Sequence, residues 1–302
     1  MLDGLRHEAM PYRGESGFVT ACLDVVRDGL DQDHRLIVLA AAEKLAAVTD
    51  ALGPDAADVT LVAIDEHGRN PSRITTILNT FQSGGDGRHC LGVCESVFAS
   101  RSPAALAEAQ LSEFLLNDER VSAWPLTLVC LYDSDTLPAA ALDVMRQSHA
   151  VVRGQDTNPE FLPDHAATLL AAALDPPPAS AQLIDVDADT LSLMRDFVRA
   201  NAVRAALGAD RVDDLVLAAN EVVTNSIRYA GGRARLAMWT TGIGAVCDVL
   251  DTGHVSDRFA GRFAPPPGAT SGRGLWLAHH LCDLVQFRTT PEGTRVRLHV
   301  DR

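Results

Sequence analysis

Lysine is almost absent from this sequence. Lys44 is the only lysine among 302 residues, and arginine supplies the other permanently charged basic side chains. A phosphate loop of the Walker A type requires Gly-Lys-Ser/Thr, whereas Lys44 lies in Ala-Glu-Lys-Leu. The sequence therefore excludes a nucleotide site of the P-loop class.

Long apolar segments and an excess of basic charge are also missing. No run of about 18 uncharged apolar residues is present to span a membrane, and residues 1–14 carry charges where a signal peptide has an apolar core. The formal net charge of −14 disfavours binding to the phosphate backbone of nucleic acids. We therefore expect a cytoplasmic protein with protein partners and no direct contact to nucleic acid or membrane.

The first half alternates between apolar runs and helical patterns. The runs are almost continuously apolar, as is typical of strands buried on both faces of a sheet, and cover residues 35–40, 59–65, 90–95 and 126–132. Helical patterns lie near residues 15–29, 43–52, 71–82 and 103–117. Asn70 and Pro71 are suited to cap and begin the third helix, as Ser102 and Pro103 are for the fourth. This alternation predicts an α/β domain with a parallel sheet and helices on both faces.

A proline cluster divides the sequence. An alanine-rich helix is predicted near residues 159–174, and the Asp-Pro-Pro-Pro segment at 175–178 cannot continue it. We therefore predict one domain over residues 1–174, a linker over 175–182 and a second domain over 183–302. A loop inside a single domain is the alternative interpretation of the prolines.

The second half has a different order of elements. A short apolar run at 183–186 precedes helical patterns near 188–207 and 211–230. Strand patterns at 234–241 and 245–251, a loop at 254–272, a helix near 275–283 and strands at 284–290 and 294–301 follow. This order predicts an α+β domain of two layers, with helices on one face of a mostly antiparallel sheet.

The helix predicted over residues 211–230 has two distinct faces. Apolar side chains gather on one face, and Glu221, Asn225 and Arg228 gather on the other, where Leu217 is the one apolar exception. Glu221 and Asn225 are four residues apart, so their side chains project together. Taken alone, this pattern is that of the solvated face of an amphipathic helix.

Two short motifs follow that helix. Asp251-Thr252-Gly253 ends an apolar run, where the carboxylate can accept a hydrogen bond and Gly253 permits close approach of a ligand. Ser271-Gly272-Arg273-Gly274-Leu275 opens a helix, whose N–H groups and dipole favour an anion, and Arg273 adds positive charge. Each motif taken alone also fits an ordinary turn.

The order and spacing of these motifs resemble the GHKL ATPases, the superfamily of gyrase, the heat-shock 90 chaperones and the histidine kinases. The resemblance covers roughly residues 185–302 and implies the Bergerat ATP-binding fold. It implies that Asn225 binds the Mg²⁺ ion that bridges the nucleotide phosphates, that Asp251 recognises the adenine amino group, and that the loop at 254–272 is the ATP lid. The other nucleotide-lining residues would be Gly253, Gly272, Arg273, Gly274 and Leu275.

The segment from Glu221 to Ala230 further resembles anti-sigma factors that act as protein serine/threonine kinases. This implies that Glu221 orients or deprotonates a serine hydroxyl of an anti-anti-sigma (STAS-type) partner, that a sigma factor is sequestered, and that a homodimer forms. Two features depart from the pattern: Tyr229 replaces a frequent histidine, and His254-Val255 replaces a frequent second glycine. The alternative is therefore a non-catalytic module in which ATP only stiffens a partner-binding surface.

Short motifs in the first half resemble the MEDS sensory domain of methanogen and methylotroph regulators. The resemblance covers about residues 5–160 and rests on four segments, at 7–14, 68–74, 102–108 and 130–133. It implies a RecA-like α/β fold without a phosphate loop, and a sensory role. Arg69 and Asn70 also fit a purely structural role in bracing a helix.

Histidine and cysteine raise two further hypotheses, which we disfavour. His89-Cys90-x3-Cys94 lacks the tighter, repeated spacing of zinc ligands, and cysteines four apart on a strand lie too far apart for a disulfide. We therefore expect the six cysteines to be mostly reduced and buried. A histidine kinase would need a helical hairpin with a phosphoacceptor before the ATPase domain, and no such hairpin contains His7, His34, His67 or His149.

Overall fold

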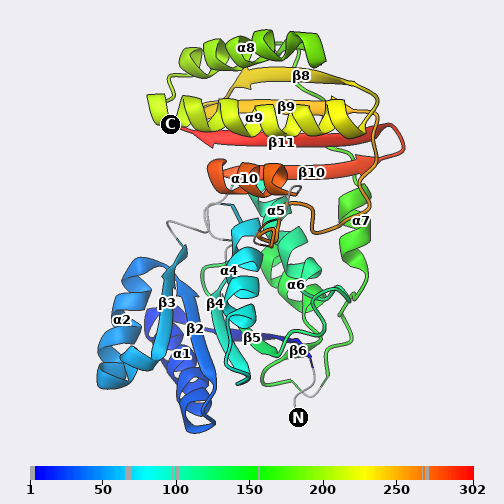
Figure 1. The fold of residues 1–302 in the computed structure, drawn as a ribbon. Coiled ribbons are helices and arrows are strands. Elements are labelled where there is room, and N and C mark those ends of the chain that lie inside the picture. The colour runs from blue at the N-terminus through cyan, green and yellow to red at the C-terminus, as the bar shows by residue number, and fades with distance from the viewer. Residues whose placement is uncertain are drawn as a thin grey trace. The chain divides into compact units, whose positions relative to one another are not determined.

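The computed structural model of the chain describes residues 4–64, 70–96, 98, 102–155, 157–266, 268 and 272–302. Contacts between residues divide the chain into two compact units, residues 1–166 and 167–302 (Figure 1). Among the described residues, no helix is long and apolar enough to cross a membrane. The sequence-based expectations for Asp65, His67, Gly68, Arg69 and Ser271 fall outside the described residues, and the predicted limits of the linker stay a prediction.

The first unit contains a six-stranded sheet in the order β3-β2-β4-β5-β1-β6, and every pairing is parallel. The strands are β1 (Arg6–Tyr12), β2 (Arg35–Ala40), β3 (Val59–Ala63), β4 (Cys90–Glu95), β5 (Leu126–Asp133) and β6 (Val151–Val152). The helices are α1 (Gly14–Asp31), α2 (Ala42–Leu52), α4 (Ser72–Ser83), α5 (Pro103–Leu115) and α6 (Ala139–Ser148), with a 3-10 turn, η1 (Gly53–Asp58). The predicted parallel α/β domain is therefore confirmed.

Local sequence signals explain where two of these helices begin. The Ser102 hydroxyl accepts a hydrogen bond from the Ala105 N–H at 3.2 Å, and Pro103 occupies the first turn of α5. The Asn70 side chain accepts from the Ser72 N–H at 3.2 Å, just before α4. The predicted cap of α5 is confirmed, whereas α4 begins one residue later than predicted, with Pro71 at the cap position and no side-chain cap bond.

Two sequence-based expectations for this region need correction. The alanine-rich helix predicted over 159–174 is shorter, because α7 covers only His165–Ala171. The Leu162 N–H donates instead to the Gln147 carbonyl at 2.8 Å, which holds the preceding residues outside the helix. The strand β1 was not predicted from its polar sequence. Its buried Glu8 is paired with Arg6 at 2.5 Å and with Arg153 at 2.9 Å, which is why a charged residue lies inside the sheet.

The second unit contains a five-stranded sheet in the order β10-β11-β9-β8-β7, and every pairing is antiparallel. The strands are β7 (Gln182–Asp187), β8 (Arg233–Thr240), β9 (Gly244–Asp251), β10 (Leu284–Thr290) and β11 (Gly293–Asp301). The helices are α8 (Leu191–Arg204), which follows a 3-10 turn, η2 (Ala188–Thr190), then α9 (Ala209–Tyr229) and α10 (Arg273–Leu281). The predicted α+β domain is confirmed.

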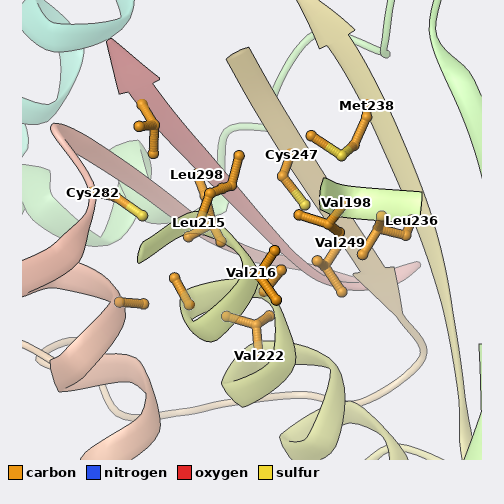
Figure 2. Close-up of a cluster of buried hydrophobic side chains, with 14 of the residues drawn as sticks. Val198, Leu215, Val216, Val222, Leu236, Met238, Cys247, Val249, Cys282 and Leu298 are labelled. Carbon is orange, nitrogen blue, oxygen red and sulfur yellow. The ribbon is translucent and has the colours of Figure 1, made fainter. Parts of the chain in front are cut away.

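The core of the second unit lies between its helices and one face of the sheet (Figure 2). The apolar face of α9 packs there, and Leu215, Ala219 and Val223 are fully buried. Leu217, the apolar exception on the polar face, is 44% exposed. The core therefore fixes the rotation of α9, and the polar face that carries Glu221 and Asn225 points away from it.

The opposite face of the same sheet is polar. Arg297 donates to the Asp248 carboxylate at 2.7 Å, so that two charged side chains are buried as a pair on neighbouring strands. Arg297 also donates to the Asp175 carbonyl at 2.6 Å, and Arg295 donates to the Leu174 carbonyl at 3.3 Å. These bonds fasten the chain segment after α7 to β11.

Candidate functional site

Asp251 lies at the end of β9, and its carboxylate is hydrogen-bonded both to α9 and to the loop that follows β9. The Ser226 hydroxyl donates to Asp251 Oδ2 at 2.5 Å, and the Gly253 N–H donates to Asp251 Oδ1 at 2.8 Å. A carboxylate oxygen has two lone pairs, so each oxygen can still accept a hydrogen bond from a ligand. The two protein donors therefore orient the carboxylate without exhausting its capacity.

Gly253 is required by packing. A Cβ atom at this position would lie 2.6 Å from the Ala230 Cβ atom, which is too close for any other residue without a local shift. The Thr294 hydroxyl donates to the Gly253 carbonyl at 2.8 Å, and Thr294 lies opposite Asp251 in the β9–β11 pairing. Three elements, α9, β9 and β11, therefore meet around this turn.

The start of α10 lies against the polar face of α9. A Cβ atom on Gly274 would lie 2.8 Å from Glu221 Oε2 and 3.2 Å from Asn225 Nδ2. Gly272, the cap of α10, has a φ of +85°, in the left-handed region that favours glycine. Because a glycine cap has no side chain to accept from the first helical N–H groups, those groups are left for another acceptor.

These elements line one open cavity of about 560 Å³, within the size range of small-molecule sites. It is lined by all eight predicted site residues, which are the catalytic candidate Glu221 and seven nucleotide-binding candidates: Asn225, Asp251, Gly253, Gly272, Arg273, Gly274 and Leu275. Val222, Phe287 and Val296 add apolar surface. The structure thus brings the three sequence motifs together, while the role of each residue stays a prediction.

Among the lining residues that the sequence did not predict, Ser226 and Thr294 hydrogen-bond to the predicted site. Ser226 follows the predicted metal ligand directly, but its buried side points to the sheet, so the helical pattern alone marks it as core. Thr294 reaches the cavity only through the β9–β11 register, which a single strand does not reveal. Both residues are identified by their hydrogen bonds, since Ser226 donates to Asp251 and Thr294 donates to the Gly253 carbonyl.

The loop predicted as a lid is partly anchored to the domain. Phe259 is 2% exposed and stacks on Phe263, with ring centroids 4.9 Å apart. Gly261 has a φ of +77°, and a Cβ there would lie 2.8 Å from the backbone of Leu275. The described first part of the loop is therefore packed on α10. The residues that depart from the family pattern, Tyr229 and His254-Val255, also line the cavity.

The polar groups of the first unit include its only lysine. Lys44 donates to Glu95 Oε1 at 2.5 Å and to the Tyr12 hydroxyl at 3.1 Å. Burial alone would lower the pKa of Lys44, but the bonds to Glu95 and Tyr12 outweigh burial and raise the pKa. Lys44, on α2, is therefore a charged side chain paired with Glu95 at the end of β4.

The cysteines are buried, as expected. All six belong to the described part of the chain, and none is in a disulfide. Burial raises the pKa of the Cys22 thiol to about 12 and also raises the pKa of Cys94. Both are therefore protonated thiols near neutral pH.

An antiparallel sheet with helices on one face, and a cavity between α9, α10 and the end of β9, is the architecture of a GHKL-type ATPase domain. A family model of the histidine kinase-like ATPase domain matches residues 184–300. The model of the MEDS domain, the methanogen/methylotroph DcmR sensory domain, matches residues 6–150. The chain therefore joins a MEDS sensory domain to a histidine kinase-like ATPase domain. A comparison with curated proteins gives no match.

Proposed function

We propose that the protein is a bacterial cytoplasmic regulator of the anti-sigma type. It would bind Mg-ATP in the cavity of the second unit and phosphorylate a serine or threonine of a STAS-type anti-anti-sigma protein. It would also sequester a sigma factor, under control of the sensory unit. The observation that carries the proposal is the single cavity where Glu221, Asn225 and Asp251 meet the glycine-capped start of α10.

The residues around the cavity fit Mg-ATP chemically. The Asn225 amide oxygen is a hard donor of the kind that Mg²⁺ prefers. The Asp251 carboxylate is the acceptor that an exocyclic amino group needs, and it is already oriented by Ser226 and Gly253. The absence of a side chain at Gly274 leaves space beside Glu221 that a Cβ atom would fill.

The proposed mechanism relies on positioning. Bound Mg-ATP supplies the phosphoryl group, and the metal ion neutralises the charge that develops on it. Asn225 would hold the ion, and the N–H groups at the start of α10 would hold phosphate oxygens. Glu221, whose Oε2 atom is beside Gly274, would orient the partner's hydroxyl group and accept its proton.

Nucleotide binding is tested first. Mg-ATP is titrated into wild type, Asn225→Ala and Asp251→Asn by calorimetry, and each substitution is expected to weaken binding more than about tenfold, or roughly 1.4 kcal/mol. Asn220→Ala is the matched control, because Asn220 lies on the same helix but accepts from Arg195 on the exposed surface. Absence of binding by wild type would contradict the proposal.

Phosphoryl transfer is tested separately, with radiolabelled ATP and the STAS-type proteins encoded in the source genome. Glu221→Gln is expected to bind Mg-ATP like wild type and to lose transfer by about 100-fold or more, the usual contribution of a positioned base. Equal transfer by the variant would exclude Glu221 as the base. If wild type transfers nothing while Mg-ATP tightens binding to a sigma factor, the non-catalytic module replaces the kinase.

A further inference from the structure

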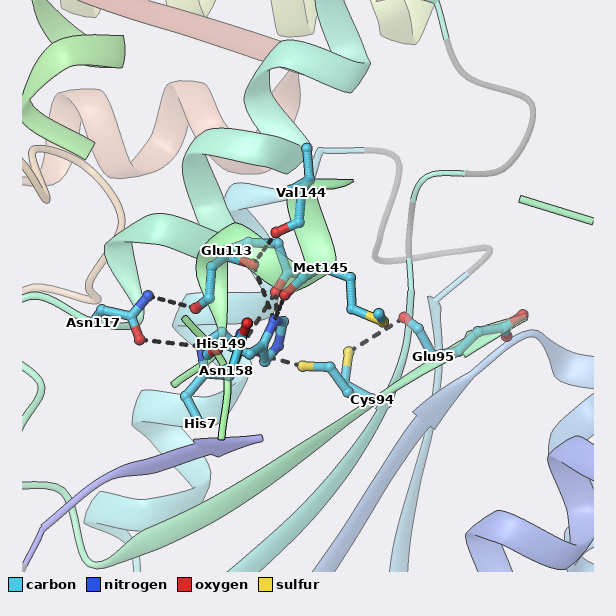
Figure 3. Close-up of polar contacts among 11 residues, drawn as sticks. His7, Cys94, Glu95, Glu113, Asn117, Val144, Met145, His149 and Asn158 are labelled. Atoms are coloured by element: carbon cyan, nitrogen blue, oxygen red, sulfur yellow. Dashed lines mark hydrogen bonds and ion pairs between the residues drawn. The ribbon is translucent and has the colours of Figure 1, made fainter. Parts of the chain in front are cut away.

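Four side chains that commonly bind metal ions meet inside the first unit, far in sequence from the ATP cavity. They come from different elements: His7 from β1, Cys130 from β5, Glu113 from α5 and His149 from the residue after α6. Their ligand atoms all lie within 4.8 Å of one another, and all four residues are buried. Figure 3 shows His7, Glu113 and His149 converging on one point.

The distances between these atoms are those of a tetrahedral site. Glu113 Oε2 lies 3.3 Å from His7 Nε2 and 3.6 Å from His149 Nε2. The Cys130 Sγ atom lies 3.4 Å from His7 Nε2. Zinc bonds of about 2.0 Å to nitrogen or oxygen and about 2.3 Å to sulfur place neighbouring tetrahedral ligands about 3.3–3.7 Å apart.

Two of the four ligand atoms form no hydrogen bond within the described part of the chain. Neither Glu113 Oε2 nor His149 Nε2 has a hydrogen-bond partner within the part of the chain that the structure describes. The His149 side chain is fully buried, and that of Glu113 is 10% exposed. Buried polar atoms without partners destabilise a fold, and a cation at the centre of the cluster would satisfy both.

The surrounding residues fix both imidazole rings for metal binding. His149 Nδ1 lies 2.9 Å from the Met145 carbonyl oxygen, and His7 Nδ1 lies 3.4 Å from the amide oxygen of Asn117 (Figure 3). Because these oxygens only accept, both Nδ1 atoms carry the hydrogen, and the Nε2 lone pairs face the cluster. Asn117 is held in turn by its bond to the Ser148 carbonyl at 2.8 Å. Metal-binding histidines typically show this second layer of hydrogen bonds.

We propose that His7, Glu113, Cys130 and His149 bind one divalent transition-metal ion of the zinc class. Two imidazoles, a thiolate and a carboxylate suit Zn²⁺, and the two anionic ligands balance its charge. Four protein ligands leave no open coordination position, so the site is structural or sensory and not catalytic. The ion would tie β1, β5, α5 and α6 together at the centre of the sensory unit.

The test uses Co²⁺ as a spectroscopic probe of the full-length chain, prepared without metal. Wild type is expected to bind one equivalent, with the visible absorption bands of tetrahedral Co²⁺ and a thiolate-to-cobalt charge-transfer band, both removed by Zn²⁺. Cys130→Ser should lose the charge-transfer band. Cys22→Ser is the matched control, because Cys22 is equally buried but lies on α1, outside the cluster, and should keep the full spectrum.

A second variant is needed because the loss of a buried ligand could unfold the core and so abolish Co²⁺ binding indirectly. Asn117→Leu keeps all four ligands and removes the partner of His7 Nδ1 together with the bond to the Ser148 carbonyl, so it should weaken Co²⁺ binding by about 10- to 100-fold. Circular dichroism shows whether each variant is folded. A folded wild type without the tetrahedral spectrum, or a charge-transfer band that persists in Cys130→Ser, would overturn the proposal.

Discussion

The two units gather their polar side chains in opposite ways. In the first, Glu113 and its three neighbours are enclosed between a parallel sheet and the helices that cover it. In the second, Glu221, Asn225 and Asp251 line an open cavity at the end of an antiparallel sheet. A sheet covered on both faces buries what lies on it, whereas a two-layer domain leaves helix starts and strand ends accessible. An enclosed site suits a resident ion, and an open one suits a ligand that exchanges.

The largest expected effect follows from metal removal. A chelator should lower the stability of the first unit by about 4 kcal/mol if the free ion had been held near a thousand times its Kd. Hydrogen exchange measured peptide by peptide should show faster exchange within residues 1–166 and unchanged exchange within residues 167–302. Cys130→Ser should not respond to the chelator. Equally faster hydrogen exchange in both units would show that metal removal does not act on the first unit alone.

Acidification should destabilise the second unit through His299. Burial, reinforced by the charge of Arg297, lowers the pKa of His299 from 6.5 to about 4. Between these values the unfolded chain binds the proton and the folded chain does not. The contribution of neutral His299 to the free energy of unfolding is therefore complete above pH 6.5 and is lost as the pH falls to about 4. The full shift corresponds to about 3 kcal/mol. Urea unfolding across this pH range measures the loss.

His299→Gln is the variant that assigns this loss. Glutamine removes the titrating group and retains a donor for the Gln286 side-chain oxygen, which lies 3.1 Å from His299 Nε2. The pH dependence of the variant should be flatter than that of wild type. Identical pH curves would show that other groups cause the acid sensitivity.

A methyl group at Gly274 should close the open site. In Gly274→Ala the new Cβ would lie 2.8 Å from Glu221 Oε2, which we expect to weaken Mg-ATP binding by at least about 100-fold, or roughly 2.7 kcal/mol. Gly242→Ala is the control, since a Cβ there meets no atom within 4 Å. Calorimetry gives both affinities, and Co²⁺ binding to the first unit should be unchanged. Normal affinity in Gly274→Ala would show that the nucleotide binds elsewhere.

The smallest effect concerns the orientation of Asp251. Ser226→Ala removes the hydroxyl that donates to Asp251 Oδ2, and the loss of one such bond is worth about 1 kcal/mol, or roughly fivefold in Mg-ATP affinity. Thr252→Ala should change affinity less than about twofold, because the Thr252 hydroxyl binds the Ala230 carbonyl instead. Equal effects of the two substitutions would argue against a special role for Ser226.

The open site could largely be predicted from the sequence, because its parts carry local signals. Glu221 and Asn225 are one helical turn apart, and Gly272 and Gly274 mark the start of a helix. What could not be predicted is how tightly Gly274 approaches α9, or that Thr294 reaches Gly253. Both depend on the pairing and packing of elements distant in the sequence.

The enclosed cluster carries no such signal. His7 and Cys130 are 123 positions apart and meet only because β1 pairs with β5 in the sheet. The same limit applies to β1 itself, whose Glu8 is balanced by Arg153 at the other end of the unit's sequence. In the sequence, His7 and Cys130 belong to the MEDS-like segments 7–14 and 130–133, and His7 and His149 were also candidate phosphoacceptors. No spacing rule detects ligands that are brought together by topology.

The bonds from Arg295 and Arg297 to the segment after α7 have a mechanical consequence. They attach Leu174 and Asp175 to β11, a strand paired on both sides, with β10 and with β9. A force on this segment would act on β11, and the backbone hydrogen bonds of β11 to β10 and β9 would resist it together. The same strand begins at Gly293 and Thr294, beside the cavity. Tension in residues 174–175 would therefore act on the strand that borders the cavity proposed to bind ATP.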